Sequence, residues 1–379
     1  MTPEQFQEEV SKTKAKIVLD SELSLIGQKT KIYGDITIDL NGNKLHMENK
    51  TADSINVYSG GKLTLMDSKG TGKIYCTKTY PEGYKVNLIT LNGDAKFVMN
   101  SGLIDTGLDN PGVNGHYAIG VYDAGKVIIN GGKINAGWFA ISGNGSETTK
   151  DAEIVINGGT IISLSNFAIY HPHPGKITIN GGVISGAGGA VAFNAGEFVF
   201  NNGTFTSTGS EDIQFGDYSK DGTYGLADAA ININCKYGDV GGNINGGTIV
   251  SKKPVLINED KYTPSLVIKG GMFIGEDVSY LQEYCAEGVS INSDGSISTD
   301  DSVNLVNSSS IDTVELNKML GSIGSCLEGL TKQYVETELI QKYEQGDINS
   351  YFTLQKILRF SDDKEIREYI VTRMQSINI

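Results

Sequence analysis

The stretch Lys126–Ile134 reads KVIINGGKI, and its pattern returns as EIVINGGTI at Glu153–Ile161 and as KITINGGVI at Lys176–Ile184. In each unit apolar and polar residues alternate, the chain turns at Asn-Gly-Gly, and another short alternating run begins. Each unit therefore predicts a strand, a tight turn and a second strand. One such unit buries too little surface alone, so the units must stack to build a shared core.

Weaker copies extend the repeat in both directions. They read KFVMNSGLI at Lys96–Ile104, EFVFNNGTF at Glu197–Phe205, GNINGGTI at Gly242–Ile249 and LVIKGGMFI at Leu266–Ile274. From Gly102 to Gly271 the second glycines lie 30, 27, 23, 21, 44 and 24 residues apart. We interpret the spacing of 44 as two coils of 22, and we expect about a dozen coils in all.

This repeat predicts a mainly β protein, a single-stranded right-handed parallel β-helix over residues 15–300 with neighbouring strands about 4.8 Å apart. The second glycine of each turn should adopt a backbone conformation that residues with a Cβ avoid. The asparagines at the same corner should then stack as a hydrogen-bonded ladder of side-chain amides. They are Asn130, Asn157, Asn180, Asn201 and Asn245.

Both ends of such a solenoid need a cap, because an open strand edge invites another chain. Residues 1–14 predict a capping helix, since Thr2-Pro3-Glu4-Gln5 fits a capping box, and Phe6 and Val10 would face the first coil. At the other end, Gly270–Ser298 predicts a last coil, a short helix with Tyr280, Leu281 and Tyr284, and a hairpin at Asp294-Gly295.

After a linker at 301–310 the period becomes helical, and residues 311–379 predict a small α-helical domain for oligomerisation or anchoring. Its first helix carries a coiled-coil seam with alternating spacings of four and three residues. The seam consists of Leu316, Leu320, Ile323, Leu327, Leu330 and Tyr334. The helices either pack on themselves as a three-helix unit, or the seam pairs with copies of itself or docks on a larger assembly.

Composition excludes several classes of partner. The net charge of −14 leaves no basic footprint for nucleic acid. No apolar run is long enough to span a membrane, and Met1–Val10 is polar and acidic rather than signal-like. With Met1 as the start, the protein is expected to be made in a cytoplasm and not exported by a cleaved signal. No motif indicates a cofactor.

Several segments carry a resemblance to a known group. They are KIVLDSELSL at Lys16–Leu25, DITIDLNGNKL at Asp35–Leu45, INVYSGGKLTLMDSKGTGKI at Ile55–Ile74, the NGG coils and GGMFIGEDVSYLQEY at Gly270–Tyr284. Together they resemble the pectate-lyase-like β-helix proteins common in gut bacteria and their phages. The resemblance implies the fold over about 300 residues, and it places fibre, tailspike and adhesin functions among the expectations.

The resemblance also implies which residues a catalytic β-helix would need. β-Helix lyases of this kind bind calcium through aspartates and use a basic residue, typically arginine, to remove a proton α to a carboxylate. The only arginines here are Arg359, Arg367 and Arg373, so the body would need a lysine in that role. A glycosidase would instead need two or three carboxylates on one face.

Aligning the coils on their glycines places Tyr122, Tyr170 and His171 on one outward face, with Asn144 and Asn194. The only tryptophan, Trp138, either joins Tyr122 and Tyr170 in stacking on a sugar ring or packs at a coil corner. Candidate glycan-binding residues are therefore Tyr122, Trp138, Tyr170 and His171.

Two further features are candidates for metal binding. The segment His171-Pro172-His173-Pro174 predicts a stiff turn with two exposed histidines, and alternating histidines can also bind a metal. In the inserted loop Gly209–Asp228, Asp217 and Asp221 are candidates for a cation site or a catalytic pair, with plain solvated charge as the alternative.

The function we expect is a non-enzymatic fibre component of a phage virion, anchored or multimerised through its C-terminal helices. Its partners would be copies of itself, other virion or surface proteins, and a bacterial surface polysaccharide. The alternatives are a tailspike-type polysaccharide depolymerase and a bacterial surface adhesin.

Overall fold

The structure is a computed structural model of the 379-residue chain. It describes residues 1–49, 53–76, 86–107, 116–143, 151–208, 229–258, 261–299 and 335–344, with eight single positions between 350 and 373. The chain divides into two compact units, Met1–Asp300 and Asp301–Ile379.

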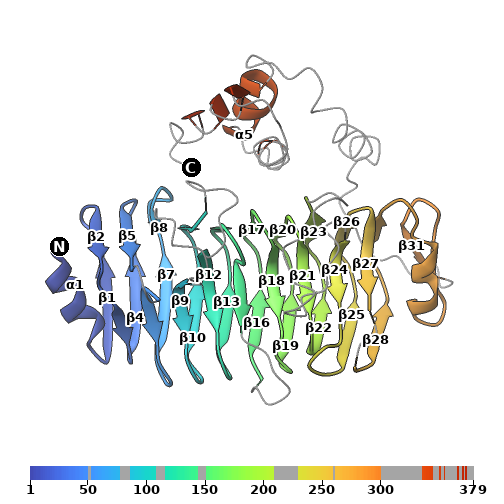
Figure 1. Ribbon diagram of the computed structural model, residues 1–379, viewed down its shortest axis with the longest axis horizontal. Helices are drawn as coiled ribbons and strands as arrows, with labels where there is room; N and C mark the ends of the chain where they lie inside the picture. Colours follow the sequence, from blue (N-terminus) through green and yellow to red (C-terminus); the bar gives the residue numbers. More distant parts are fainter. Residues whose placement is uncertain are drawn as a thin grey trace. The chain divides into compact units, whose positions relative to one another are not determined.

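The first unit is built from three long parallel sheets that run side by side along its length (Figure 1). Sheet A contains β1 Lys14–Val18, β4 Asp35–Asp39, β7 Lys62–Met66, β10 Lys96–Met99, β13 Lys126–Ile129, β16 Glu153–Ile156, β19 Lys176–Ile179, β22 Gly196–Phe200, β25 Val240–Ile244 and β28 Pro264–Ile268. Sheet B contains β2 Leu23–Ile26, β5 Lys44–Glu48, β8 Lys73–Tyr75, β11 Leu103–Asp105, β14 Lys133–Ala136, β17 Thr160–Ser163, β20 Val183–Gly186, β23 Thr204–Ser207, β26 Thr248–Val250 and β29 Met272–Ile274. Sheet C contains β3 Thr30–Ile32, β6 Ile55–Val57, β9 Val86–Leu91, β12 His116–Val121, β15 Ile141–Gly143, β18 Phe167–His171, β21 Gly189–Phe193, β24 Ala229–Ile233 and β27 Lys253–Ile257.

Each strand pairs in parallel with the strand three places later in the chain, so one coil contributes one strand to each sheet. Alternate side chains point inward: in β13, Val127 and Ile129 are buried while Lys126 and Ile128 are partly exposed. The inward side chains of all coils join one continuous apolar core. The chain is therefore a parallel β-helix, as the repeat predicts.

The corner between sheets A and B confirms the predicted amide ladder. Each asparagine Nδ2 donates to the Oδ1 of the asparagine one coil earlier, at 2.7–2.9 Å, from Asn245 through Asn201, Asn180, Asn157 and Asn130 to Asn100. The second glycine of every turn from Gly102 to Gly271 has a positive φ, between 86° at Gly132 and 127° at Gly203. A side chain there would be strained, which explains the repeated glycine.

The prediction that the 44-residue spacing contains two coils is wrong. β22 pairs directly with β25, and β23 pairs directly with β26, so these 44 residues form one coil and not two. The extra residues lie between Ser207 and Ala229, in the connection from β23 to β24. Among the described residues, sheets A and B have ten strands each, which gives ten coils where about a dozen were expected.

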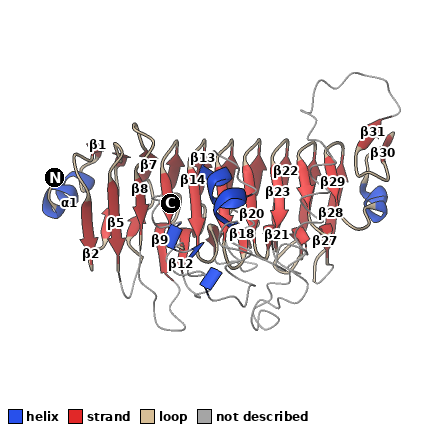
Figure 2. Cartoon of the chain, turned by 90° about the horizontal axis from the view of Figure 1, so that it is seen from above, coloured by secondary structure: helices blue, strands red, loops and turns tan. Residues whose placement is uncertain are grey.

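Both ends of the solenoid are covered as predicted. The helix α1, Pro3–Val10, begins with the Thr2–Gln5 capping box, and it buries Phe6 and Val10 against the first coil. At the other end the short 3₁₀ helix η1, Ser279–Tyr284, buries Leu281, and the hairpin β30 Val289–Ile291 and β31 Ile297–Thr299 follows it. Figure 2 shows these helices at opposite ends of the row of stacked strands.

The second unit is described only in part. A π-helical turn at Val335–Ile340 continues into α5, Gln341–Glu344, and Arg373 forms an ion pair with Glu336, which also accepts a hydrogen bond from Tyr369 at 2.8 Å. The predicted seam lies outside the described residues; its members are Leu316, Leu320, Ile323, Leu327, Leu330 and Tyr334. No described helix is long and apolar enough to cross a membrane.

Candidate functional site

The connections between sheets distinguish one corner of the solenoid from the others. Connections from sheet A to sheet B contain three to six residues, whereas those from sheet B to sheet C contain between two and 21. The long ones cover residues 76–85, 106–115 and 208–228. Because binding residues concentrate on variable loops carried by a rigid scaffold, this B–C corner is the first place to look for function.

Buried polar groups without partners gather on sheets B and C and at their corners. Among the described residues such side-chain atoms occur on Asn87, Asn135, Ser165, Asn166 and Asn232, which lie on sheet B, sheet C or the turn between them. Others occur in the connections from sheet C to sheet A, on His173, Asn194 and Asn234. No described strand of sheet A has such an atom. Unpartnered buried polar groups are costly, and they are retained where a ligand or water completes them.

An aromatic cluster lies outside the main core at this corner. It contains Tyr117, Trp138, Phe139 and Phe167, with Tyr170 packed against it. Tyr117 and Phe139 are stacked with ring centroids 5.4 Å apart, and Phe139 and Tyr170 are stacked at 5.1 Å, while Trp138 contacts Phe139 edge-on. Tyr117, Phe139 and Tyr170 therefore form an aromatic row across three consecutive coils, with Phe139 in the turn before β15.

Polar groups continue this row. The Tyr170 hydroxyl accepts a hydrogen bond from Asn194 Nδ2 at 2.8 Å, and the Tyr122 hydroxyl accepts one from Asn87 Nδ2 at 3.2 Å. Asn87 also donates through its backbone N–H to Asp53 Oδ1 at 2.9 Å. Burial raises the pKa of both tyrosines, so the hydroxyls remain neutral and able to donate.

The structure places the predicted glycan-binding residues unequally. Tyr122 and Tyr170 are partly exposed on the outside of the solenoid, whereas Trp138 is 8% exposed and packs at a coil corner, the second of its two predicted positions. His171 is completely buried, and its ring contacts Phe193 of the core. The expected outward position of His171 is therefore wrong, because it ends β18 at an inward position, opposite Phe193 in the register.

The prediction of two exposed histidines in the turn is also wrong, because His173 is only 1% exposed. Its Nε2 lies 3.0 Å from the carbonyl oxygen of Val121, and the two histidine rings are 5.9 Å apart. Burial and the neighbouring His173 lower the pKa of His171 to about 3, although the Gly175 backbone opposes the shift. Burial also lowers the pKa of His173, against the Val121 carbonyl and Asp123.

The sequence analysis missed a charged network on the outer face of sheet B. Lys73 Nζ lies 3.6 Å from the carboxylate of Asp105 and 4.5 Å above the ring of Tyr75, which stacks on His46 at 4.7 Å. Burial lowers the pKa of Lys133, one strand further along, to about 8, although Asp105 opposes the shift. These residues lie in four different coils, so only the register of β5, β8, β11 and β14 could reveal them.

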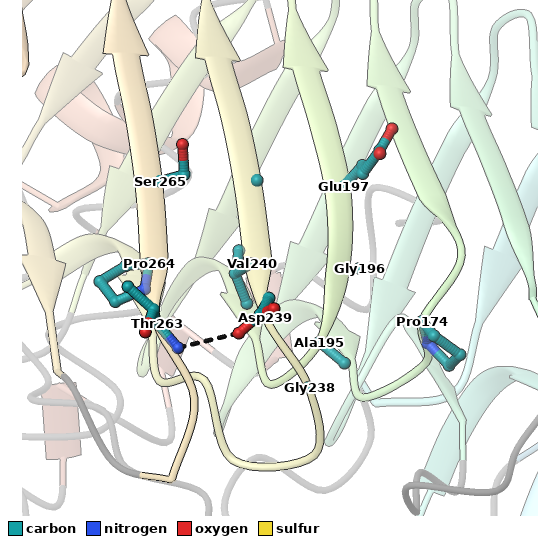
Figure 3. A pocket seen from close by; sticks show the side chains of 11 residues that line it. Pro174, Ala195, Gly196, Glu197, Gly238, Asp239, Val240, Thr263, Pro264 and Ser265 are labelled. Atoms are coloured by element: carbon teal, nitrogen blue, oxygen red, sulfur yellow. Dashed lines mark hydrogen bonds between the residues drawn. The ribbon is translucent and has the colours of Figure 1, made fainter.

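A shallow groove of about 460 Å³ lies on the outer face of sheet A near its C-terminal end (Figure 3). It exists because Gly196, Gly238 and Gly241 place no side chains there, between the carboxylates of Glu197 and Asp239. Asp239 already accepts a hydrogen bond from the Thr263 N–H at 3.0 Å, drawn as a dashed line.

The candidate metal ligands Asp217 and Asp221 lie outside the described residues. In the part of the chain that the structure describes, no group of three or more His, Cys, Asp and Glu side chains is arranged to hold a metal ion. No known protein family, curated protein or solved structure matches this chain.

Proposed function

We propose that this chain is a non-enzymatic structural fibre protein, a component of a phage virion, which binds a bacterial surface glycan on the outside of sheet C around Tyr170. The observation that carries the binding proposal is the surroundings of Tyr170. Next to Tyr170 in the register lies only the small Ala192, and the coil after that carries Asn232. The strands of the next two coils therefore place only small or amide side chains beside the Tyr170 ring, while Tyr237 lies close enough to the Tyr170 hydroxyl to raise its pKa.

This arrangement suits the two kinds of surface on a sugar. The partly exposed ring of Tyr170 offers an apolar plane, and the amides of Asn194 and Asn232, both fully buried in the unbound protein, are groups that can exchange hydrogen bonds with hydroxyls. Asn194 Oδ1 and Asn232 Oδ1 are both buried without a partner among the described residues. A bound hydroxyl would complete these acceptors.

The test is binding of the full chain to purified surface polysaccharides of candidate hosts, measured by calorimetry. Tyr170→Ala and Asn232→Ala should each weaken binding about tenfold, because each removes one contact worth about 1–2 kcal/mol. Tyr33→Ala is the matched control, since Tyr33 is a tyrosine stacked on Tyr58 near the other end of sheet C. Equal affinity for all variants would exclude this site.

The virion assignment is supported by the rigid capped rod together with the resemblance of its sequence segments. Mass spectrometry of purified phage particles from a culture that carries the gene should detect the chain as a stable component. Detection on intact uninfected bacteria, and not in particles, would favour the adhesin alternative.

A depolymerase is the second candidate, and Lys133 is the observation that favours it. A lysine with a pKa of about 8 next to Asp105 can act as a general base near neutral pH. Incubation with the same polysaccharides should then release products with unsaturated-sugar absorbance or new reducing ends, and Lys133→Met should abolish them. Absence of both products with a polysaccharide that the protein binds would remove this candidate.

A further inference from the structure

The outer face of sheet A differs from the B–C corner, because it is regular over eight consecutive coils. Its strands present one row of charged side chains and a second, largely β-branched row, both following the register. The charged row is Lys14, Asp35, Lys62, Lys96, Lys126, Glu153, Lys176 and Glu197. The second row is Lys16, Thr37, Thr64, Val98, Ile128, Val155, Thr178 and Val199.

We propose that sheet A is an interface between two copies of this chain, which pack face to face with their long axes antiparallel. A two-fold axis parallel to the strands, placed between β10 and β13, brings each row opposite the same row of the partner in reverse order. The first strand of the eight then faces the eighth, the second faces the seventh, and so on.

Charge complementarity supports this occupant. In the reversed register Lys14 faces Glu197, Asp35 faces Lys176, and Lys62 faces Glu153, so three of the four distinct pairs have opposite charges. The fourth pair joins Lys96 to Lys126. Within one chain Lys126 Nζ already lies 2.6 Å from the carboxylate of Glu153, and Lys62 Nζ lies 3.3 Å from that of Asp35, so the interface would join these pairs into networks of both charges.

The second row supplies the apolar part of the same interface. At its centre Val98 faces Ile128, and Thr64 faces Val155 on either side. Three of these residues are partly exposed in the single chain, namely Val98, Ile128 and Val155. Pairing would remove their side chains from water.

The area of the outer face of sheet A determines the affinity expected for the dimer. Eight strands spaced about 4.8 Å apart and about four residues wide give roughly 500 Å² per copy, or about 1,000 Å² in total. That is the lower limit for a specific interface, so a reversible dimer of modest affinity is expected. The groove beside Gly241 borders this interface, because Gly196 and Glu197 of the eighth strand line it.

A charge swap tests the register. Lys14 and Glu197 are exposed, and neither forms an ion pair with another described residue, so changing them disturbs little else. Glu197→Lys should raise the dimer dissociation constant about tenfold in sedimentation equilibrium, because two attractive contacts become repulsive. Lys14→Glu should do the same, and the double variant should restore the wild-type constant.

Glu287→Lys is the matched control, since it makes the same charge change on an exposed residue outside sheet A, and it should leave the constant unchanged. A monomeric wild type, or an association indifferent to Glu197, would overturn the proposal. Failure of the double variant to recover would overturn the antiparallel register.

Crosslinking gives an independent readout. Thr37 and Thr178 face each other across the proposed dimer but lie five coils apart within one chain, about 24 Å at 4.8 Å per coil. The double variant Thr37→Cys/Thr178→Cys should form a covalent dimer on oxidation, in excess of wild type. Thr37→Cys alone should not, and equal crosslinking by both would contradict the proposed pairing.

Discussion

The side-chain amide of Asn245 donates a 2.9 Å hydrogen bond to Oδ1 of Asn201, 44 residues earlier in the chain. This contact shows that one coil spans the whole interval, since every other link of the ladder also joins adjacent coils. The ladder lies at the corner between sheets A and B, whereas the insertion lies in the connection from sheet B to sheet C. The ladder therefore keeps its register across the insertion.

The ladder should contribute to stability in proportion to the bonds that each amide makes. Asn180 makes two, one to Asn157 at 2.8 Å and one from Asn201 at 2.7 Å, whereas Asn100 at the end accepts only one, from Asn130. Asn180→Ala should therefore lower the free energy of unfolding by about 1–2 kcal/mol, and Asn100→Ala by about half as much. Urea unfolding measures both, and equal losses would show that the ladder is incidental.

The insertion between β23 and β24 should be dispensable for folding. Replacing residues 208–228 by the two-residue connection Ala187-Gly188, which joins β20 to β21, leaves a coil of ordinary length. We expect an unchanged β-type circular dichroism spectrum and a cooperative thermal transition. An unfolded product would mean that the inserted residues form part of the core after all.

Acid should destabilise the protein through His171. Its pKa falls from 6.5 in the unfolded chain to about 3 in the folded protein, so the unfolded state binds more protons between these values. The stabilisation is complete above pH 6.5 and is lost as the pH falls towards 3, by at most about 5 kcal/mol. Urea unfolding at a series of pH values measures the loss.

His171→Leu should flatten this dependence between pH 6.5 and 4, while His46→Gln, a partly exposed histidine on sheet B, should keep it. An unchanged slope in His171→Leu would assign the acid sensitivity to other groups.

The helical tail makes a separate prediction about assembly. If the seam pairs with copies of itself, Ile323→Asp/Leu327→Asp should abolish that association and leave the β-helix spectrum unchanged, because the seam loses its apolar contacts. Light scattering of the double variant, alone and combined with Glu197→Lys, separates tail contacts from sheet A contacts. Normal assembly of the tail variant would make the tail a self-contained unit.

The sequence determined the β-helix, its amide corner and its caps. Each coil repeats the same sequence pattern, with alternating apolar and polar residues in the strands and Asn-Gly-Gly in the turn. Each coil also contacts chiefly its neighbours. The capping box at Thr2 and the hairpin at Asp294 are equally local, since their hydrogen bonds join residues two or three positions apart. The caps can be predicted from sequence because these interactions are local, and the amide ladder can be predicted because every coil repeats an asparagine at the same corner.

Only the tertiary structure decided what lies at the other two corners. The alternating pattern says which residues of a strand share a face, but it does not say where the chain bends. It therefore placed His171 on an outward face, which is wrong, and it left open whether Trp138 packs at a corner. The gathering of Lys73, Asp105 and Lys133 on sheet B required the register of strands 30 or more residues apart. Insertions change those separations, so the spacing in the sequence does not show which of these side chains come into contact.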